Sequence, residues 1–521
     1  MTARGVIAAG NPATAAAGAE VLADGGNAVD AALACLCAAA VAEPVLASLG
    51  GGGFLVCRMN EGRGAGRTLV YDFFAQTPGR RRSSSDADVQ TVHADFGQTQ
   101  QAFRVGLGTI ATPGVIRGLE MAAGELGRLP LRRLIEPACT LARAGVRLDA
   151  MQAYVVSVVA ALLKSRPESA ELFASPRDRE ALIGEGEVFR LPDYADALEN
   201  IAIEGADLFY RGEMGRRLAE DCLGHGGHLV RADLERYRAE RRRPIEIERF
   251  GARIHLNPPP AIGGLLVAYA LAVMPTEGLA PGTFGSSLHL RHLVAALAEA
   301  DQARAGLPDD RLDEAGEQLL TPEGLAAAQR RLRAAAPIAR RGTTHISVID
   351  GSGNAAALSV TNGEGSGYVL PGTGIILNNM LGEDDLCPDG PDAWPTDRRM
   401  SSMMAPTLIE RDDGALVALG SGGSTRIRAA ILQVILNQLV LGASLAEAVG
   451  WPRLHLEEGR LSFEPGFPAS SLPPLSGPVG EFDPWSAQNL FFGGVHAAMR
   501  ERGGSLIGAA DRRRAGAVVL V

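Results

Sequence analysis

The sequence predicts an α/β protein in which helices and strands form layers within one intertwined unit. Two helical segments open the chain and lead through a glycine-rich turn into a strand. A β-hairpin follows Gly342, and a second hairpin at 405–419 leads into an apolar helix at 427–441. Strands in both halves of the chain, with helical segments on either side of them, are typical of helices packed on sheets.

The first sixty residues carry the clearest local signals. Residues 11–24 and 27–42 predict two helices, because the two glycines between them are typical of a helix end. The most apolar run, 31–42, is shorter than the ~20 residues that cross a bilayer, and it therefore predicts a buried core helix. Four consecutive glycines then lead into a strand predicted over 54–58.

The middle of the chain is mainly helical. Residues 114–239 are rich in Arg, Ala and Leu, and three prolines at 258–260 precede one long apolar helix that reaches residue 303. The charged, Arg-rich segment 309–341 is interpreted as a solvated arm. Because the net charge is −10, neither nucleic acid nor a membrane is expected as a partner.

The hairpin that starts at Gly342 carries the main chemical signal. Residues 344–349 alternate and 355–361 run back, with a turn that is symmetric about Ser352. This register places Thr343 directly across from Thr361, with Cβ atoms ~5 Å apart on one face. Two opposed hydroxyls at the open end of a hairpin are unusual for packing alone, although a threonine pair is also explained by β-propensity.

The chemistry that fits these residues is autoproteolysis. The Thr343 hydroxyl can attack the carbonyl of Gly342, because glycine leaves the scissile bond uncrowded. Hydrolysis of the resulting ester frees an α-amine on Thr343, with an ordinary pKa near 8. That amine can then act as the general base for the hydroxyl of its own residue, so no histidine is required.

Residues 341–350, Arg-Gly-Thr-Thr-His-Ile-Ser-Val-Ile-Asp, resemble the processing motif of the γ-glutamyltransferase family of N-terminal-nucleophile (Ntn) hydrolases. Further motifs match that family in the same order over nearly the whole chain: 25–32, 49–54, 108–109, 112–114, 258–260 with 263–264, 377–379 and 401–403. The resemblance implies a four-layer αββα sandwich, with a large-subunit segment 1–342 and a small-subunit segment 343–521 from one precursor. It also implies acyl-enzyme chemistry at Thr343 and a supporting role for Thr361.

The loop from Gly420 to Arg426 is the candidate oxyanion hole. It leads directly into an apolar helix, so it offers backbone N–H groups at the positive end of a helix. It resembles the corresponding family loop and indicates Gly422 and Gly423 as donors, although Gly422 stands where the family has proline. Phosphate binding is the rival reading, but the loop lacks the lysine of a P-loop.

The carboxylate side of the glutamyl site departs from the family. Phe74 stands where the family has the arginine that binds the glutamyl α-carboxylate. A charge-assisted contact worth roughly 1.5–3 kcal/mol is therefore absent. Ser401 and Ser402, which resemble the other carboxylate contacts, remain.

The amino side of that site is altered as well. Met380 replaces a polar residue and cannot accept strongly from an ammonium group. Asn379 and Glu383 are the substrate contacts expected here, with Asp384 as an alternative acceptor. The glycine-rich loop 362–368 replaces a family segment and is expected to reshape the pocket floor.

The residues expected to catalyse the reaction are present, but several of the residues expected to bind the glutamyl group are replaced. The leading hypothesis is therefore a self-processing amidohydrolase or acyltransferase for a small-molecule amide other than glutathione. The alternatives are a true γ-glutamyl hydrolase or transferase in which Arg80, Arg81 or Arg82 replaces the missing arginine, a β-lactam side-chain acylase, and an unprocessed, non-catalytic paralogue.

The remaining expectations concern cofactors, location and assembly. No cofactor or metal is expected, because the nine histidines do not fall at metal-binding spacing with Cys or Glu. The N-terminus lacks a long apolar segment, so a cytoplasmic location is expected. The two subunit segments are expected to stay together, and a homodimer or a dimer of heterodimers is left open.

Overall fold

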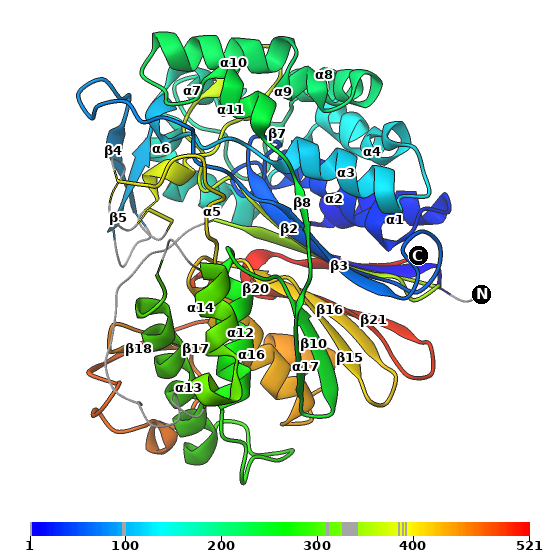
Figure 1. Ribbon diagram of the computed structural model, residues 1–521, viewed down its shortest axis with the longest axis vertical. Coiled ribbons are helices and arrows are strands. Elements are labelled where there is room, and N and C mark those ends of the chain that lie inside the picture. Colours follow the sequence, from blue (N-terminus) through cyan, green and yellow to red (C-terminus); the bar gives the residue numbers. More distant parts are fainter. Residues whose placement is uncertain are drawn as a thin grey trace.

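The computed structural model describes residues 3–95, 100–308, 312–325, 342–383, 386–387, 390 and 393–521. Most of the Arg-rich segment 309–341 lies outside these ranges, as does Asp384. Two sheets lie face to face, and each is covered on its outer face by helices (Figure 1). This arrangement is the four-layer αββα sandwich that the family resemblance implied.

Each sheet combines strands from both sides of Gly342. The seven-stranded sheet has the order β22 (Ala517–Leu520), β1 (Gly5–Ala9), β11 (Thr344–Asp350), β12 (Ala355–Thr361), β2 (Gly52–Met59), β3 (Arg67–Phe73) and β8 (Glu240–Arg242). The six-stranded sheet has the order β21 (Leu506–Ala510), β20 (Gly494–Arg500), β16 (Leu416–Gly422), β15 (Thr407–Arg411), β10 (Ala252–Leu256) and β9 (Ile245–Arg249). A small apolar layer that includes Val56, Ile349 and Leu408 fills the space between the sheets.

The predicted register of the central hairpin is confirmed. Thr344 of β11 pairs with Val360 of β12, and Ile346 pairs with Leu358. One further step along this register places Thr343 opposite Thr361. The hairpin is central in its sheet, since β1 pairs with β11 and β2 pairs with β12.

The helices over the seven-stranded sheet come from the first half of the chain. They are α1 (Pro12–Ala23), α2 (Ala28–Ala42), α3 (Val115–Leu126), α4 (Leu131–Ala144) and α8 (Pro192–Glu204). Shorter helices complete this half: α5 (Ala150–Val158), α6 (Ala160–Leu163), α7 (Pro167–Leu172), α9 (Asp207–Tyr210), α10 (Glu213–Gly224) and α11 (Arg231–Arg236). Small two- and three-stranded sheets are formed by β4 (Gln90–Asp95) with β5 (Gln100–Val105), β6 (Val146–Arg147) with β7 (Val188–Phe189), β13 (Val369–Leu370) with β14 (Ile375–Ile376), and β17 (Leu454–Glu457), β18 (Arg460–Phe463) and β19 (Glu481–Pro484).

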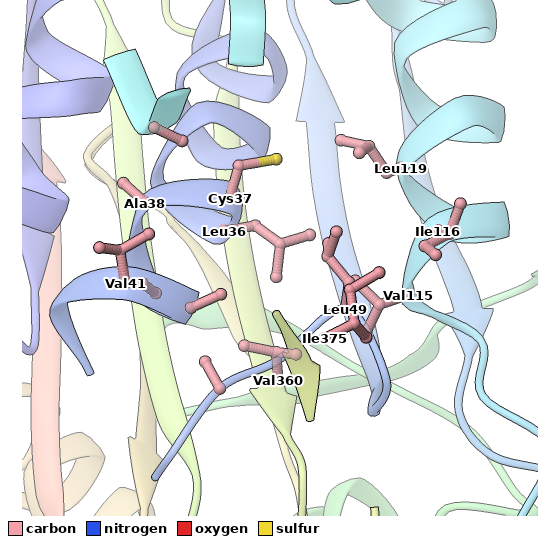
Figure 2. Packing of buried hydrophobic residues seen from close by; sticks show 14 of the residues in the cluster. Leu36, Cys37, Ala38, Val41, Leu49, Val115, Ile116, Leu119, Val360 and Ile375 are labelled. Carbon is pink, nitrogen blue, oxygen red and sulfur yellow. The ribbon is translucent and has the colours of Figure 1, made fainter. Parts of the chain in front are cut away.

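Helix α2 is the buried core helix that the sequence predicted. Asn27 caps it, accepting from the backbone N–H groups of Val29 and Asp30, and every residue of α2 is buried. Leu36 and Val41 of this helix pack together with Leu119 of α3 and Val360 of β12 (Figure 2). No helix within the described ranges is long and apolar enough to cross a membrane.

The helices over the six-stranded sheet correct one prediction. The expected single helix up to residue 303 is two helices, α12 (Ile262–Val273) and α13 (Ser287–Ala305). Pro275 and Pro281 lie between them, and proline cannot continue a helix. Also on this side are α14 (Leu312–Leu319), α16 (Arg426–Leu439) and α17 (Leu445–Gly450).

Candidate active site

The peptide bond between Gly342 and Thr343 lies at the open end of the β11–β12 hairpin. The carbonyl oxygen of Gly342 accepts one hydrogen bond from Thr343 Oγ1 at 2.7 Å and another from Thr361 Oγ1 at 2.6 Å. Thr361 Oγ1 itself accepts from the backbone N–H of Gly363 at 3.0 Å. Thr343 and Thr361 are only 4% and 7% exposed. The two predicted hydroxyls therefore meet at the carbonyl of the predicted scissile bond.

Two charged side chains hold the residues on either side of this bond. The backbone N–H of Gly342 donates to Glu364 Oε1 at 2.8 Å, and the Glu364 N–H donates to Asn379 Oδ1 at 3.0 Å. On the other side, Arg514 Nη1 donates to the carbonyl oxygen of Thr343 at 3.0 Å. These contacts hold the backbone in place on both sides of the scissile peptide bond.

A buried carboxylate anchors the start of β11. Glu43 accepts from the hydroxyl of Thr344 at 2.6 Å and from that of Thr14 at 2.8 Å. Burial raises the pKa of Glu43, while the two hydroxyl donors oppose that rise. Glu43 thus fixes the strand one residue after Thr343.

A buried histidine of β11 connects the two strands of the hairpin. His345 bonds through its two ring nitrogens to Ser359 Oγ at 2.8 Å and Ser347 Oγ at 2.9 Å. Burial lowers the pKa of His345 well below its ordinary value of 6.5. A Cβ at Gly420 would lie 2.3 Å from this ring, so glycine allows β16 to approach β11 closely.

The glycine loop after β16 faces Thr343. Gly422 pairs with Gly494 as the last residue of β16, and a Cβ there would lie only 1.9 Å from the carbonyl oxygen of Thr343. Gly423 and Ser424 both have positive φ, at 124° and 52°, and form the turn before α16. Of the two predicted oxyanion residues, Gly423 therefore lies in the turn and Gly422 in the last strand position before it.

A small pocket adjoins both threonines. Besides Gly342, Thr343 and Thr361, its lining comprises Phe74, Glu383, Leu386, Ser402, Met403, Met404, Ser424 and Ile427. Phe74 is 1% exposed and stacks on Phe54, with ring centroids 5.4 Å apart. Within the described part of the chain, no arginine lines this pocket.

Comparison with known proteins identifies the family. The sequence pattern of the family described as gamma-glutamyltranspeptidase matches residues 14–521. The chain belongs to this family. It is accordingly an amide-hydrolysing or acyl-transferring enzyme with the Ntn-hydrolase architecture.

Curated relatives cover almost the whole chain. An acylase ACY 1 proenzyme from Pseudomonas sp. (strain V22) is 32% identical over 99% of this chain and 94% of its own length. A glutathione hydrolase proenzyme from Escherichia coli (strain K12) is 29% identical over 98% of this chain and 90% of its own. The crystal structure of a cephalosporin acylase from Bacillus halodurans has a TM-score of 0.84 at 24% identity, covering 99% of this chain and 96% of that one, and so shares the fold.

Only some of the predicted substrate contacts in this γ-glutamyltranspeptidase-family chain line the pocket. Phe74, Ser402 and Glu383 do, and Ser402 Oγ also accepts from the backbone N–H of Met404 at 3.1 Å. Ser401 does not line it, and neither does Asn379, whose side chain bonds to the backbone of Glu364 and Arg104.

The three arginines considered as replacements for the missing one lie elsewhere. Arg82 donates to the carbonyl oxygens of Gly227 and Leu223, each at 2.6 Å. Arg81 lies over the ring of Trp394, and Arg80 is exposed. None of the three lines the pocket of Phe74.

Three residues near the scissile bond were not predicted as site residues. Glu364 lies in the glycine-rich loop that the sequence singled out, but its contact with Gly342 depends on how that loop folds. Glu43 ends the apolar run and carries no spacing signal. Arg514 is one of three consecutive arginines near the C-terminus, with nothing in the sequence to distinguish it.

The cysteines and the potential metal ligands were also located in the described ranges. None of the six cysteines forms a disulfide, and all six are buried. No group of three or more His, Cys, Asp or Glu side chains suited to a metal ion occurs among these residues.

Proposed function

We propose that this family member is a self-processing amidase in which Thr343 is the nucleophile of both self-cleavage and turnover. The observation that carries the proposal is the convergence of the Thr343 and Thr361 hydroxyls on the carbonyl oxygen of Gly342. Proenzyme names among the relatives support a processing step. The mature enzyme would consist of segments 1–342 and 343–521, held together by the strands that they share.

In self-cleavage, Thr343 Oγ1 attacks the carbonyl carbon of Gly342. Negative charge develops on the carbonyl oxygen, where Thr361 already donates a hydrogen bond. The C–N bond breaks, the hydroxyl proton passes to the departing nitrogen, and an ester joins Gly342 to Thr343. Water hydrolyses this ester, leaving a carboxylate on Gly342 and a free α-amine on Thr343.

In turnover, the free α-amine of Thr343 takes the hydroxyl proton as Oγ1 attacks the carbonyl carbon of a substrate amide. We assign the oxyanion donors to the backbone N–H groups of Gly423 and Ser424, because these residues form the turn next to Thr343. The substrate's amine leaves with the proton held by the α-amine. Water, or a second amine, then attacks the acyl-Thr343 ester and releases the acyl group.

The acyl group is expected to be small and neutral. The pocket of Phe74 combines apolar side chains with neutral hydroxyl groups, and Glu383 is the charged group among its described lining residues. A glutamyl α-carboxylate would meet no arginine there, and Glu383 could pair only with the α-ammonium group. Leaving the α-carboxylate unpaired costs several kcal/mol, which disfavours glutathione as the substrate.

A substrate panel tests this proposal. The mature protein is assayed with 4-nitroanilides of acetyl, butyryl, glutaryl and γ-glutamyl groups. We expect the best neutral acyl anilide to exceed the γ-glutamyl anilide in kcat/KM by ~100-fold or more. A preference for glutaryl would favour the acylase alternative, and an unprocessed chain without activity would favour the non-catalytic paralogue.

The cytoplasmic location stays a prediction from the sequence, and the choice between a homodimer and a dimer of heterodimers stays open.

A further inference from the structure

A second pocket adjoins the scissile bond and shares only Gly342 with the pocket of Phe74. One wall is the apolar face of α5, and another is the short helix η4 (Leu490–Phe492) with the preceding loop. The principal apolar lining residues are Met151, Tyr154, Val155, Val158, Trp485 and Phe491. The pocket is therefore suited to an aromatic or branched apolar group.

A buried guanidinium lines this apolar pocket. Arg514 is 6% exposed, and its Nη1 donates to the carbonyl oxygen of Thr343. Among the residues that the structure describes, none places a carboxylate oxygen within 4.0 Å of it. Asp511, in the preceding turn, is instead engaged by Arg453 at 2.7 Å and Arg513 at 3.2 Å.

The charge of Arg514 remains in place at neutral pH. Burial lowers the pKa of Arg514 to about 10, which still leaves the group protonated. Arg426, the other arginine in the pocket lining, is paired with Glu457 at 2.9 Å and lies over the ring of Phe491. Asp511 and Glu43 attract the charge of Arg514 from a distance and favour its protonated form, but neither carboxylate is in direct contact with it. A ligand carboxylate in the pocket would provide a direct anionic partner and offset the cost of burying the cation.

Glycines clear the path that Arg514 takes toward Thr343. A Cβ at Gly494 would lie 2.4 Å from the Cδ of Arg514, and one at Gly422 would lie 3.0 Å from its Nη1. A Cβ at Gly423 would lie 3.5 Å from Nη2. These glycines thus leave room for the guanidinium of Arg514 beside Thr343, the residue that carries the reacting hydroxyl.

We propose that this pocket binds the amine side of the substrate, and that this amine is an apolar or aromatic group carrying a carboxylate that pairs with Arg514. The inference rests on the proposed amidase function and names its substrate class. That class comprises amides that join a short neutral acyl group to a carboxylated apolar amine, such as an N-acylated aromatic amino acid or a carboxylated anilide.

The exposure of the lining residues suggests which pocket holds the acyl half of the substrate and which holds the amine half. Tyr154, at the rim of the Arg514 pocket, is 38% exposed, and Trp485 is partly exposed. In the other pocket, Phe74 and Met404 are each 1% exposed. The amine must leave before water attacks, whereas the acyl group stays bound through both half-reactions, so the pocket with the exposed rim residue Tyr154 suits the amine.

The test uses two substrates that share the best acyl group of the panel, the 4-nitroanilide and the 3-carboxy-4-nitroanilide. We expect the wild-type protein to prefer the carboxylated anilide by about ten-fold or more in kcat/KM. In Arg514→Met that ratio should fall to about one. Arg512→Met, which removes an exposed arginine from the same short helix, should keep the wild-type ratio.

Product binding provides a readout that needs no turnover. Calorimetric titration should find 5-amino-2-nitrobenzoate bound about ten-fold or more tightly than 4-nitroaniline by the wild-type protein, with the difference lost in Arg514→Met. If that variant does not mature, the wild-type comparison and Tyr154→Ala, which should weaken both products, still decide the matter.

The two proposals fail in different ways. Equal kcat/KM for the two anilides, or equal affinity for the two amines, would overturn the role of Arg514 and leave the amidase function standing. A mature protein that hydrolyses none of the acyl anilides would contradict the amidase function, while the product titration would still decide whether Arg514 binds the carboxylate.

Discussion

Thr343 and Thr361 face each other across the β11–β12 hairpin, and both hydroxyls donate to the carbonyl oxygen of Gly342, at 2.7 and 2.6 Å. Strand pairing alone explains why the two residues are close, but it does not require both hydroxyls to donate to the same oxygen. The carbonyl of a bond about to be attacked gains negative charge on that oxygen, so the arrangement favours cleavage.

Replacing Thr361 with valine tests its part in both reactions. The variant keeps the shape and strand propensity of the side chain and removes the donor to Gly342. We expect slower self-cleavage and, in the fraction that matures, a kcat lower by roughly ten-fold or more, with a much smaller change in KM. Thr361→Ser, which retains a hydroxyl, should recover most of both rates. Unchanged turnover in the valine variant would remove Thr361 from the mechanism.

Replacing Glu364 with alanine is expected to affect self-cleavage more than turnover. Its carboxylate holds the backbone N–H of Gly342, a residue that is on the scissile bond only before cleavage. We expect Glu364→Ala to slow the appearance of the two fragments by several-fold, and to lower kcat of the matured protein less. Timed gels and assays of the purified mature fraction measure the two effects. Equal losses in both would mean that Glu364 does not act through Gly342.

Phe74 tests the specificity argument. We expect Phe74→Arg to raise activity on the γ-glutamyl anilide modestly, because it restores a partner for the α-carboxylate. Full family activity is not expected, since Met380 is buried and offers no strong acceptor for the ammonium group. Phe74→Leu is the control and should give no such gain. Efficient glutathione turnover by the unmodified protein would refute the account of the pocket.

Buried neutral histidines predict how stability depends on pH. Burial lowers the pKa of His345 well below 6.5 and that of His496 to about 4. Below pH 6.5 the unfolded chain therefore binds protons that the folded chain does not, and folding stability falls as the pH falls. The expected loss is about 1.4 kcal/mol per pH unit for each such group.

Urea unfolding of Thr343→Ala, monitored at pH 7.5 and 5.5, measures this dependence on a single chain. His345→Gln should lose less stability between the two pH values than its parent. An identical change in the free energy of unfolding between pH 7.5 and 5.5 in the two proteins would show that His345 is not held neutral in the fold.

Local signals account for what could be predicted from the sequence. The register of Thr343 against Thr361 follows from a symmetric turn and from alternation along two strands, and both signals lie within nineteen residues. The buried helix α2 follows from the two glycines that precede it and from its apolar composition. The αββα layers came from the family resemblance and not from periodicity.

Tertiary contacts account for what the sequence could not provide. Arg514 reaches Thr343 across 171 positions of the chain, and only the close approach of β16 and β20 to β11 brings the two together. The prediction of one helix up to residue 303 was wrong. Both α12 and α13 are apolar and resemble one continuous helix in composition, but Pro275 and Pro281 interrupt the segment between them. For the oxyanion donors, the sequence indicated Gly422 and Gly423, and the positive φ values of Gly423 and Ser424 are the basis of the donors that we propose.

Intact-mass measurement of the purified protein, with and without Thr343→Ala, tests the central claim most directly. The wild-type chain should yield two fragments, residues 1–342 and 343–521, without added protease, and Edman degradation of the smaller one should begin Thr-Thr-His. The alanine variant should remain one chain of 521 residues. A wild-type chain that stays intact, or an alanine variant that still breaks between residues 342 and 343, would contradict the assignment of Thr343 as the nucleophile.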